Sequence, residues 1–309
     1  MGSDQENRFL ARLIKPKPVR AALITILLAA VVSGLVYCNQ AWRTRSYFAF
    51  ERTWSSHWPL TRGKLAPKRI RSLFEPFVPV RIQLEPGVNM LLDPYDLVSR
   101  IILETGQWEA DSWEAIKQHL PAGGTFIDVG AHIGYYSLRA AKRVGTSGRV
   151  IAIEPNPETL RNLRDNVEAS HATVVSVYPV ACSEAETEID LFAAARANTG
   201  MSSFSLDTAT RSGDGIRRHR VRARPLDGIV AEAGLSRVDV VKIDVEGAEL
   251  LVLRGARQTL LRYRPVLIVE VIETQLRSMD ASPAELKEFL RSLGYLPHRQ
   301  MGLNVLFSR

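Results

Sequence analysis

Residues 126–138 read FIDVGAHIGYYSL, and this stretch decides the fold. Apolar and β-branched residues lead into Asp128, two glycines follow at positions 130 and 134, and the next run has the spacing of a helix. The pattern predicts a buried strand, a tight turn and a helix. Glycine is needed in such a turn where the backbone must approach a ligand closely.

The rest of the body repeats this order of strand and helix, after a hairpin signal at 81–93 and helical patterns at 96–106 and 109–120. Alternation of this kind implies right-handed crossovers and a mostly parallel sheet with helices on both faces, the α/β class. The predicted strands are 125–129, 149–155, 173–181, 238–245 and 264–272, the main helices are 135–144, 157–170 and 282–294, and a helix begins in EGAELLVLRGA. YLPHR and LNVLFSR predict a terminal hairpin, IRRHRVRAR (216–224) a basic edge strand, and Asp227 the cap of a helix over 228–233.

Acidic residues follow several of the predicted strands. In an open parallel sheet, ligands bind beyond the carboxyl ends of the strands, so these side chains are expected along one rim. They are Asp128, Glu154, Asp244, Glu246, Glu270 and Glu273, with Cys182 at the end of the third strand.

Glu154 lies 24 residues after Gly130, at the end of the second strand. A carboxylate in that position accepts hydrogen bonds from ribose hydroxyls. The turn has the form DxGxxxG and lacks the GxGxxG spacing that serves a pyrophosphate. Together these features favour a nucleoside without phosphates, such as S-adenosylmethionine, over NAD or FAD.

Three blocks, FIDVGAHIGYYS, VIAIEPNPETLRNLRDN and VVKIDVEGAELLVLRGA, resemble the FkbM-type methyltransferases over roughly residues 80–308. RANTGMSS (196–203) and RPLDGIV (224–230) are similar to further family segments. The resemblance implies a Rossmann-like, class I fold with a seven-stranded sheet whose last strand is antiparallel. It also implies methylation by S-adenosylmethionine, usually of a hydroxyl on a sugar, polyketide or lipid-type acceptor.

The resemblance assigns a cofactor site. Its predicted residues are Asp128, Gly130, Ala131, His132, Gly134, Glu154, Asn156 and Cys182. His132 stands where the family more often has asparagine, which predicts a pH-sensitive contact with the cofactor.

The chemistry left to the protein is removal of a proton from an alcohol, which a carboxylate can perform as general base. Asp244, Glu246 and Glu270 are the predicted catalytic residues, with Asp244 and Glu246 beside the expected methyl group and Glu249 in reserve. The alternative is that Glu246 and Glu249 cap the helix that follows them. No metal site is predicted, and a Mg²⁺-assisted variant through Asp244 and Glu270 is the less favoured mechanism.

Residues 21–38, AALITILLAAVVSGLVYC, contain no charge and as a helix would span about 27 Å, near the thickness of a bilayer core. They predict a single-pass membrane anchor, with a cleaved signal peptide or a core helix as alternatives. The predicted organisation is a basic segment (1–20), the anchor, a juxtamembrane linker (39–79) and the methyltransferase domain (80–309). The basic residues around the anchor weakly favour an exported domain, whereas a cofactor made in the cytosol favours a cytosolic one.

The net charge of +7 comes from the N-terminal arm, because residues 1–75 hold 13 of the 40 Lys and Arg but 4 of the 33 Asp and Glu. This distribution speaks against a nucleic-acid partner and for membrane-flanking charge. The basic run 216–224 suggests an acidic or lipid-linked glycan or small-molecule acceptor. Two rival classes remain: a membrane-tethered scaffold without catalysis, and a nicotinamide-dependent oxidoreductase, which the glycine spacing disfavours.

Overall fold

The structure is a computed structural model that describes residues 40–57, 77–194, 200–210 and 215–309. The chain divides into two compact units, one ending at Val78 and the other beginning at Pro79. The predicted anchor, residues 21–38, lies outside the described residues. Among the helices of the described ranges, none combines the length and the apolar character needed to cross a membrane.

The first unit contains the helix α3 (Gln40–His57), which the sequence did not indicate within the predicted linker. Tyr47 and Phe48 are buried on this helix, and both rings pack against Phe77 at centroid distances of 5.1 and 5.4 Å. The Val78 amide donates a hydrogen bond to Thr44 Oγ1 at 3.1 Å. Aromatic burial therefore holds the end of this unit to its own helix.

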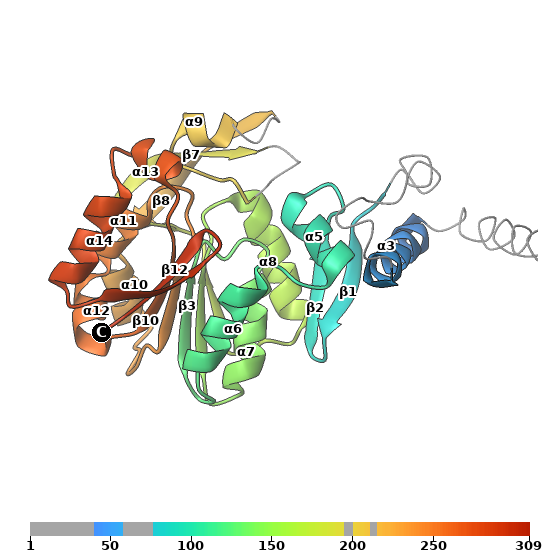
Figure 1. The fold of residues 1–309 in the computed structure, drawn as a ribbon, viewed down its shortest axis with the longest axis horizontal. Helices are drawn as coiled ribbons and strands as arrows, with labels where there is room; N and C mark the ends of the chain where they lie inside the picture. The colour runs from blue at the N-terminus through green and yellow to red at the C-terminus, as the bar shows by residue number, and fades with distance from the viewer. Residues whose placement is uncertain (1–39, 58–76, 195–199, 211–214) are drawn as a thin grey trace, which may run out of the picture. The chain divides into compact units, whose positions relative to one another are not determined.

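The second unit is built on a seven-stranded sheet of order β11-β12-β10-β9-β3-β4-β5 (Figure 1). Neighbouring strands are parallel except at β12, which pairs antiparallel with both β10 and β11. The predicted fold and its antiparallel last strand are confirmed. The strands are β3 (Thr125–Val129), β4 (Arg149–Ile153), β5 (Val175–Tyr178), β9 (Val240–Ile243), β10 (Val266–Glu270), β11 (Leu296–Met301) and β12 (Asn304–Ser308).

Helices cover both faces of this sheet, with α6, α7 and α8 on one side and α10, α11, α12 and α14 on the other (Figure 1). The central strands are apolar and fully buried because neither face meets water. The helices are α5 (Leu97–Thr105), α6 (Ala110–His119), α7 (Tyr135–Val144), α8 (Pro157–Ala169), α9 (Leu206–Thr210), α10 (Leu226–Glu232), α11 (Glu249–Gly255), α12 (Arg257–Tyr263), α13 (Glu273–Arg277) and α14 (Pro283–Ser292).

The strand order reverses at β3, with β4 and β5 on one side and β9 and β10 on the other. The connections from β3 and from β9 therefore leave toward opposite faces of the sheet. This opens a crevice at the carboxyl ends of β3 and β9, the position where doubly wound sheets bind ligands. The hairpin of β1 (Val80–Glu85) and β2 (Val88–Leu92) precedes this core, as predicted.

Two predictions about the strands that follow β5 were wrong. The expected strand 173–181 ends at Tyr178, before Pro179, and the two residues Ala181–Cys182 form β6 in a separate three-stranded sheet. In that sheet β8 (Ile216–Arg224) lies between β6 and β7 (Thr187–Ala194), so it is a central strand and not an edge.

The arginines of β8 are neutralised by acidic residues around them. Arg218 contacts Asp190 at 2.5 Å, and Arg222 contacts Glu186 at 2.7 Å, across the ladder to β7. The remaining pairs are Arg217 with Glu158, Arg220 with Glu188 and Asp190, and Arg224 with Glu232. The hypothesis that this strand recruits an acidic acceptor therefore loses its basis.

Helix capping shows one further difference. Helix α10 begins after Pro225, and the carboxylate of Asp227 accepts hydrogen bonds from the amides of Gln258 and Thr259 at the start of α12. Asp227 thus caps a helix that lies about 30 residues away, a contact that local spacing did not reveal. Helix α14, expected over 282–294, is capped by Ser282, whose Oγ accepts from the amide of Glu285 at 3.2 Å.

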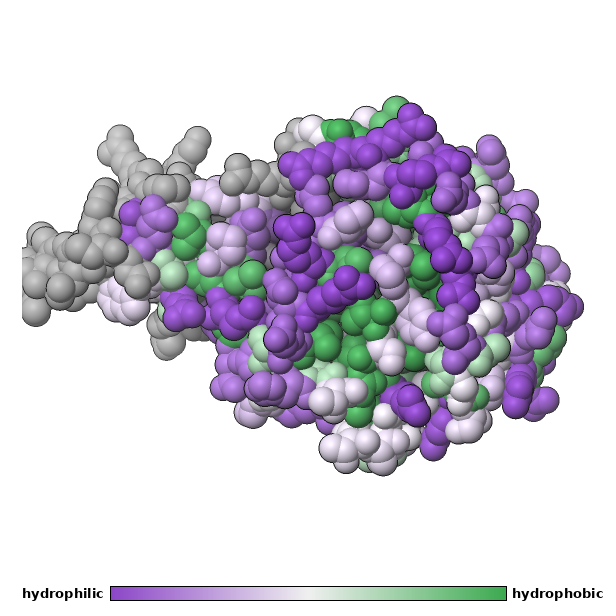
Figure 2. Space-filling model, turned by 180° about the vertical axis from the view of Figure 1, so that it is seen from behind, coloured by the Kyte–Doolittle hydropathy of each residue, from purple (hydrophilic) through white to green (hydrophobic). Residues whose placement is uncertain are grey.

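The face shown in Figure 2 is mostly hydrophilic, with hydrophobic residues gathered near its centre. Among the described residues of the second unit, the exposed large hydrophobic side chains are Leu206, Leu261, Leu296 and Leu303. They come from separate elements, and Leu303 also lines the cavity described next.

Candidate active site

A cavity of about 300 Å³ lies beyond the carboxyl ends of β3, β4, β9 and β10, within the size range of small-molecule sites. Most of the predicted site residues line it: Gly130, Ala131, His132, Glu154, Cys182, Asp244, Glu246 and Glu270. Asp128, Gly134 and Asn156 are not part of its lining. The structure therefore brings the predicted cofactor and catalytic residues to one cavity.

The glycine turn packs directly against the end of β9. The amides of Gly130 and Ala131 both donate to the carbonyl of Ile153 at 3.0 Å, which ties the turn to β4. Gly130 has φ +86°, and a Cβ at this position would lie 1.8 Å from the carbonyl oxygen of Asp244. No side chain fits there, so glycine is required by both conformation and space.

Glu154 is buried, at 5% exposure, and its two carboxylate oxygens are held by backbone amides. Oε2 accepts from the His132 amide at 2.8 Å, and Oε1 accepts from the Asn156 amide at 2.9 Å. Burial raises the pKa of Glu154 to about 7, against the lowering effect of these two hydrogen bonds. The carboxylate is fixed in place, and its charge changes near neutral pH.

His132 contributes to the site mainly through its backbone. It has φ +51°, an uncommon conformation for a residue with a side chain, and its amide is bonded to Glu154. Burial lowers the pKa of its imidazole, so the ring is neutral at neutral pH. The pH-sensitive contact of His132 stays a prediction, and Glu154 is a second group at this turn whose charge changes near neutral pH.

Asp128 and Asn156 support the turn from outside the cavity. Asp128 Oδ2 accepts from Ser137 Oγ at 2.6 Å, and burial raises its pKa. Asn156 caps α8 by accepting from the Glu158 amide at 3.0 Å. Neither residue lines the cavity, and these contacts indicate that Asp128 and Asn156 position Gly130 and Glu154. Direct contact of either residue with the cofactor stays a prediction.

Gly134 and Cys182 have structural explanations. Gly134, with φ +90°, begins α7, and a Cβ there would lie 2.7 Å from Leu163 Cδ1 of α8. Burial raises the pKa of the Cys182 thiol to about 12, so Cys182 is a neutral part of the cavity wall. Of the family-like segment 196–203, the structure describes 200–203, and Gly200, Met201 and Ser202 line the cavity beside it.

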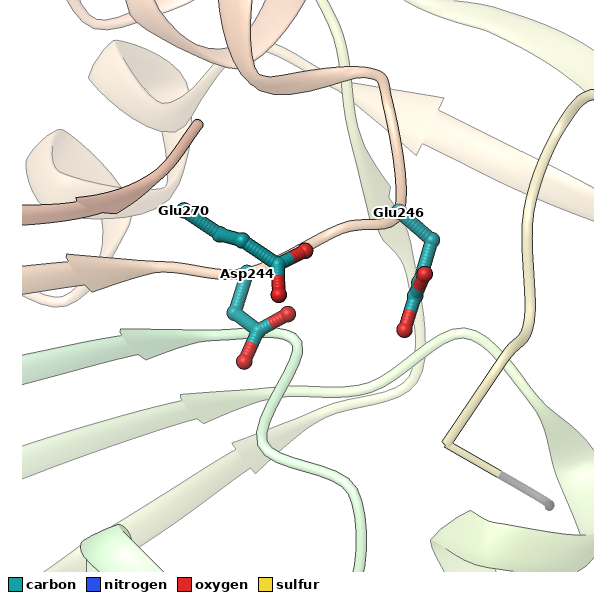
Figure 3. A group of neighbouring side chains, drawn as sticks. All are labelled: Asp244, Glu246 and Glu270. Carbon is teal, nitrogen blue, oxygen red and sulfur yellow. The ribbon is translucent and has the colours of Figure 1, made fainter. Parts of the chain in front are cut away.

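Asp244, Glu246 and Glu270 meet in the wall of the same cavity. One ligand oxygen from each lies within 4.8 Å of the others, and Figure 3 shows the three carboxylates facing a common space. Asp244 Oδ2 is paired with Lys242 Nζ at 2.6 Å, and Glu246 Oε2 accepts from Gln275 Nε2. Glu270 is 6% exposed, and its Oε2 has no hydrogen-bond partner among the described residues.

The surroundings of this cluster favour its neutral forms. Burial raises the pKa values of Glu246 and Glu270 well above the ordinary value, and the charge of Asp244 adds to the shift. Lys242 opposes the shift at both residues. A raised pKa makes each of these carboxylates, when ionised, a stronger proton acceptor.

Glu249 and Glu246 have different roles. The Glu249 carboxylate accepts from the amides of Val245 and Gly247 at 3.2 and 3.1 Å, so it fixes the turn that leads into α11. Glu246 makes no such contact, has φ +55° and directs its carboxylate into the cavity. Helix α11 has no side-chain cap hydrogen bond, so Glu249 holds the turn before the helix rather than capping it, and the capping alternative holds for neither residue.

The sequence analysis missed Lys242 and the residues around Glu109. Lys242 is 1% exposed in an otherwise apolar strand, and that isolated charge was the available signal. Glu109 has φ +40° and accepts from Tyr136 Oη at 2.7 Å and from Asn304 Nδ2 at 3.1 Å. These residues lie up to 195 positions apart, so no local pattern indicated them.

A seven-stranded sheet with one reversed strand, a glycine turn after β3 and a buried carboxylate after β4 together define a Rossmann-like methyltransferase fold. The sequence profile of the methyltransferase FkbM domain matches residues 128–297, more than half of the chain. The chain therefore belongs to the FkbM methyltransferase family. Membership identifies S-adenosylmethionine as the cofactor, in agreement with the prediction from Gly130 and Glu154.

Two curated relatives are similar over part of their length. The AMB antimetabolite synthetase AmbE of Pseudomonas aeruginosa is 29% identical over 57% of this chain and 10% of its own. The hexuronic acid methyltransferase AglP of Haloferax volcanii is 29% identical over 46% of this chain and 53% of its own. This chain thus spans about half of the second relative and a small part of the first.

Among solved structures, the methyltransferase FkbM from Methylobacillus flagellatus is similar, with 19% identity and a TM-score of 0.41. The match covers 69% of this chain and 52% of that one.

Proposed function

We propose that this protein is an S-adenosylmethionine-dependent O-methyltransferase, and that its acceptor hydroxyl lies beside Asp244, Glu246 and Glu270. The observation that carries the proposal is that one cavity contains both the Gly130–Glu154 site and this carboxylate cluster. A group transfer requires both binding functions in one cavity, because donor and acceptor must be held in line.

The part of the cavity lined by Gly130 and Glu154 fits the cofactor. Glu154 presents a carboxylate, fixed by two amides, that is suited to accept hydrogen bonds from the ribose hydroxyls. Gly130 lets the backbone of the turn approach the ligand, while Cys182 and Leu191 supply an apolar wall. When bound, S-adenosylmethionine supplies the methyl group to an incoming oxygen.

The cluster of Asp244, Glu246 and Glu270 provides the proton acceptor. Asp244 is already paired with Lys242, and Glu246 is bonded to Gln275, whereas Glu270 Oε2 accepts nothing from the described residues. The carboxylate of Glu270 is therefore the group we assign to receive the proton of the acceptor hydroxyl. Asp244 and Glu246 then orient the acceptor by accepting hydrogen bonds from its neighbouring hydroxyl groups.

A sugar is the acceptor class we favour. The hexuronic acid methyltransferase of Haloferax volcanii is a relative whose name states a sugar substrate. The cavity also combines carboxylates with the partly exposed ring of Trp108, a mixture of polar and aromatic groups suited to hydroxylated rings. Exposed Leu303 at the cavity is compatible with a lipid-linked form of that sugar.

We further propose that residues 21–38 anchor the protein in a membrane and that residues 80–309 face the cytosol. The uncharged length of the segment supports the anchor, and the cytosolic synthesis of the cofactor supports the orientation. Protease treatment of sealed inside-out and right-side-out vesicles tests both points. Cleavage of the domain only in inside-out vesicles supports the orientation, and cleavage only in right-side-out vesicles contradicts it.

The proposed activity is tested by two measurements on the full chain. Calorimetry should show binding of S-adenosylhomocysteine, and glycan and lipid extracts from cells with the gene should contain a compound heavier by one CH₂ than in cells without it. Absence of cofactor binding would favour the alternative of a scaffold without catalysis. Binding of NADH in place of S-adenosylhomocysteine would indicate an oxidoreductase.

Cofactor affinity is expected to increase by about tenfold between pH 6 and pH 8. The pKa of Glu154 is about 7, so its carboxyl is mostly protonated at pH 6 and mostly ionised at pH 8, and the ionised form accepts ribose hydroxyls more strongly. Glu154→Gln should bind S-adenosylhomocysteine weakly at both pH values. Calorimetry across this range checks the effect, and a pH-dependent affinity that survives in Glu154→Gln would assign it to another group.

A further inference from the structure

The carboxylates of Asp244, Glu246 and Glu270 have the arrangement of cation ligands. Asp244 follows β9, Glu246 lies two residues later in the same turn, and Glu270 ends the neighbouring strand β10. Their ligand oxygens lie within 4.8 Å of one another, and they face a common space in Figure 3. This inference rests on the proposed function, because the same cavity holds the acceptor.

Glu270 supplies a second observation that points to a ligand. Its side chain is more than nine-tenths buried, and Oε2 has no hydrogen-bond partner among the described residues. In Figure 3 this carboxylate is directed toward Asp244 and into the space shared with Glu246. A buried carboxylate oxygen without a partner is costly, so the arrangement calls for a positively charged or proton-donating ligand.

The described residues do not supply a positively charged partner for Glu270. Lys242 is the buried cation of this region, and its Nζ is already committed to Asp244 at 2.6 Å and to the ring of Tyr136 at 4.7 Å. Glu109, Glu249 and Asp128 add further acidic groups around the same lysine or the same cluster. One lysine therefore faces an excess of carboxylates.

We propose that Asp244, Glu246 and Glu270 bind one divalent metal cation, which holds the acceptor oxygen in the cavity. Oxygen ligands from carboxylates are the set that Mg²⁺, Mn²⁺ and Ca²⁺ prefer. Ligands on opposite sides of these ions are about 4.0–5.2 Å apart, twice the metal–oxygen distance, so the observed spacing needs little adjustment. The proposal departs from the sequence-based expectation of no metal site.

The cation would act on the acceptor by position and charge. Three protein oxygens leave coordination positions open toward the cavity, where a hydroxyl oxygen of the acceptor fits. Coordination would orient that oxygen and make its proton easier to remove, with one oxygen of the Glu270 carboxylate on the cation and the other free to receive the proton. The cofactor residues Gly130 and Glu154 also line the cavity but are not part of the ligand set.

The test is a manganese titration of the purified full chain, followed by the electron paramagnetic resonance signal of free Mn²⁺. One Mn²⁺ per chain is expected to bind, and Glu270→Gln is expected to weaken binding by about tenfold or more. Glu246→Gln serves as a second ligand variant. Glu273→Gln is the matched control, because Glu273 lies three residues further on, is exposed and is paired with Arg277, and it should bind Mn²⁺ like the wild type.

The titration is run with and without S-adenosylhomocysteine, whose own binding is measured on the same samples. Retained binding of this ligand shows that each variant is folded. Absence of Mn²⁺ binding to the wild type, or equal binding by Glu270→Gln, Glu246→Gln and Glu273→Gln, would overturn the cation site alone. Failure of S-adenosylhomocysteine to bind would count against the proposed function and leave the manganese result standing.

Discussion

Gly130→Ala is expected to abolish cofactor binding and to lower the free energy of unfolding by roughly 3–5 kcal/mol. The added Cβ would lie 1.8 Å from the carbonyl oxygen of Asp244, a backbone atom that has no rotamer to adopt. Either the glycine turn or the end of β9 must move, and both form walls of the cavity. Urea unfolding and calorimetry with S-adenosylhomocysteine measure the two effects.

Gly87→Ala is the matched control for this substitution. Gly87 has φ +85°, almost the same as the +86° of Gly130, but no atom lies within 4 Å of the Cβ that alanine would add. Conformational strain alone should cost about 1–2 kcal/mol and leave cofactor binding normal. If both variants lose the same stability and both bind the cofactor, the close approach to Asp244 is not what requires glycine at position 130.

The sequence predicted the core of the fold because that core follows local rules. Strand β3 and helix α7 have the bounds expected from FIDVGAHIGYYSL, since a run of apolar residues and a helical repeat are legible within a short window. Glu154 was also predictable, because its distance from Gly130 is set by one helix and one strand of ordinary length.

The residues that the sequence did not reveal depend on contacts between distant segments. Asp227 has the spacing of a local cap, yet it caps α12 because that helix begins against α10 in space. Strand β8 has the alternation of an edge strand, and only its pairing with both β6 and β7 makes it central. Glu109 is held at the cavity by hydrogen bonds from Tyr136 and Asn304. Both residues are far from Glu109 along the chain, so no local sequence pattern predicts these contacts.

The site itself was predictable in its composition but not in its charge balance. The sequence placed carboxylates at the ends of neighbouring strands, and the structure brings Asp244, Glu246 and Glu270 together. The sequence did not indicate which of these carboxylates are paired, because the pairing depends on the buried Lys242 of β9, the strand between β3 and β10. Lys242 therefore determines which carboxylate remains available for a ligand.

Lys242→Met is expected to lower the free energy of unfolding by about 3–5 kcal/mol. Methionine fills a similar volume, but the substitution leaves Asp244 and the nearby Asp128 without their buried cation. Carboxylates of Asp244, Glu109 and Asp128 outweigh burial and raise the pKa of Lys242, so the lysine is charged in the wild type. Urea unfolding at neutral pH, in the absence of divalent cations, measures the loss.

Lys117→Met is the control, because Lys117 pairs with Glu114 at the same distance of 2.6 Å but at 45% side-chain exposure, against 2% for Lys242. Its effect should stay within about 1 kcal/mol, since water screens the exposed pair. Asp244→Asn completes a double-mutant cycle, in which Lys242→Met with Asp244→Asn should cost less than the two single changes added together. Strict additivity of the two changes would show that Lys242 and Asp244 are not coupled. The contact of Lys242 with the Tyr136 ring, and not its pairing with Asp244, would then have to explain why Glu270 is the carboxylate left unpaired.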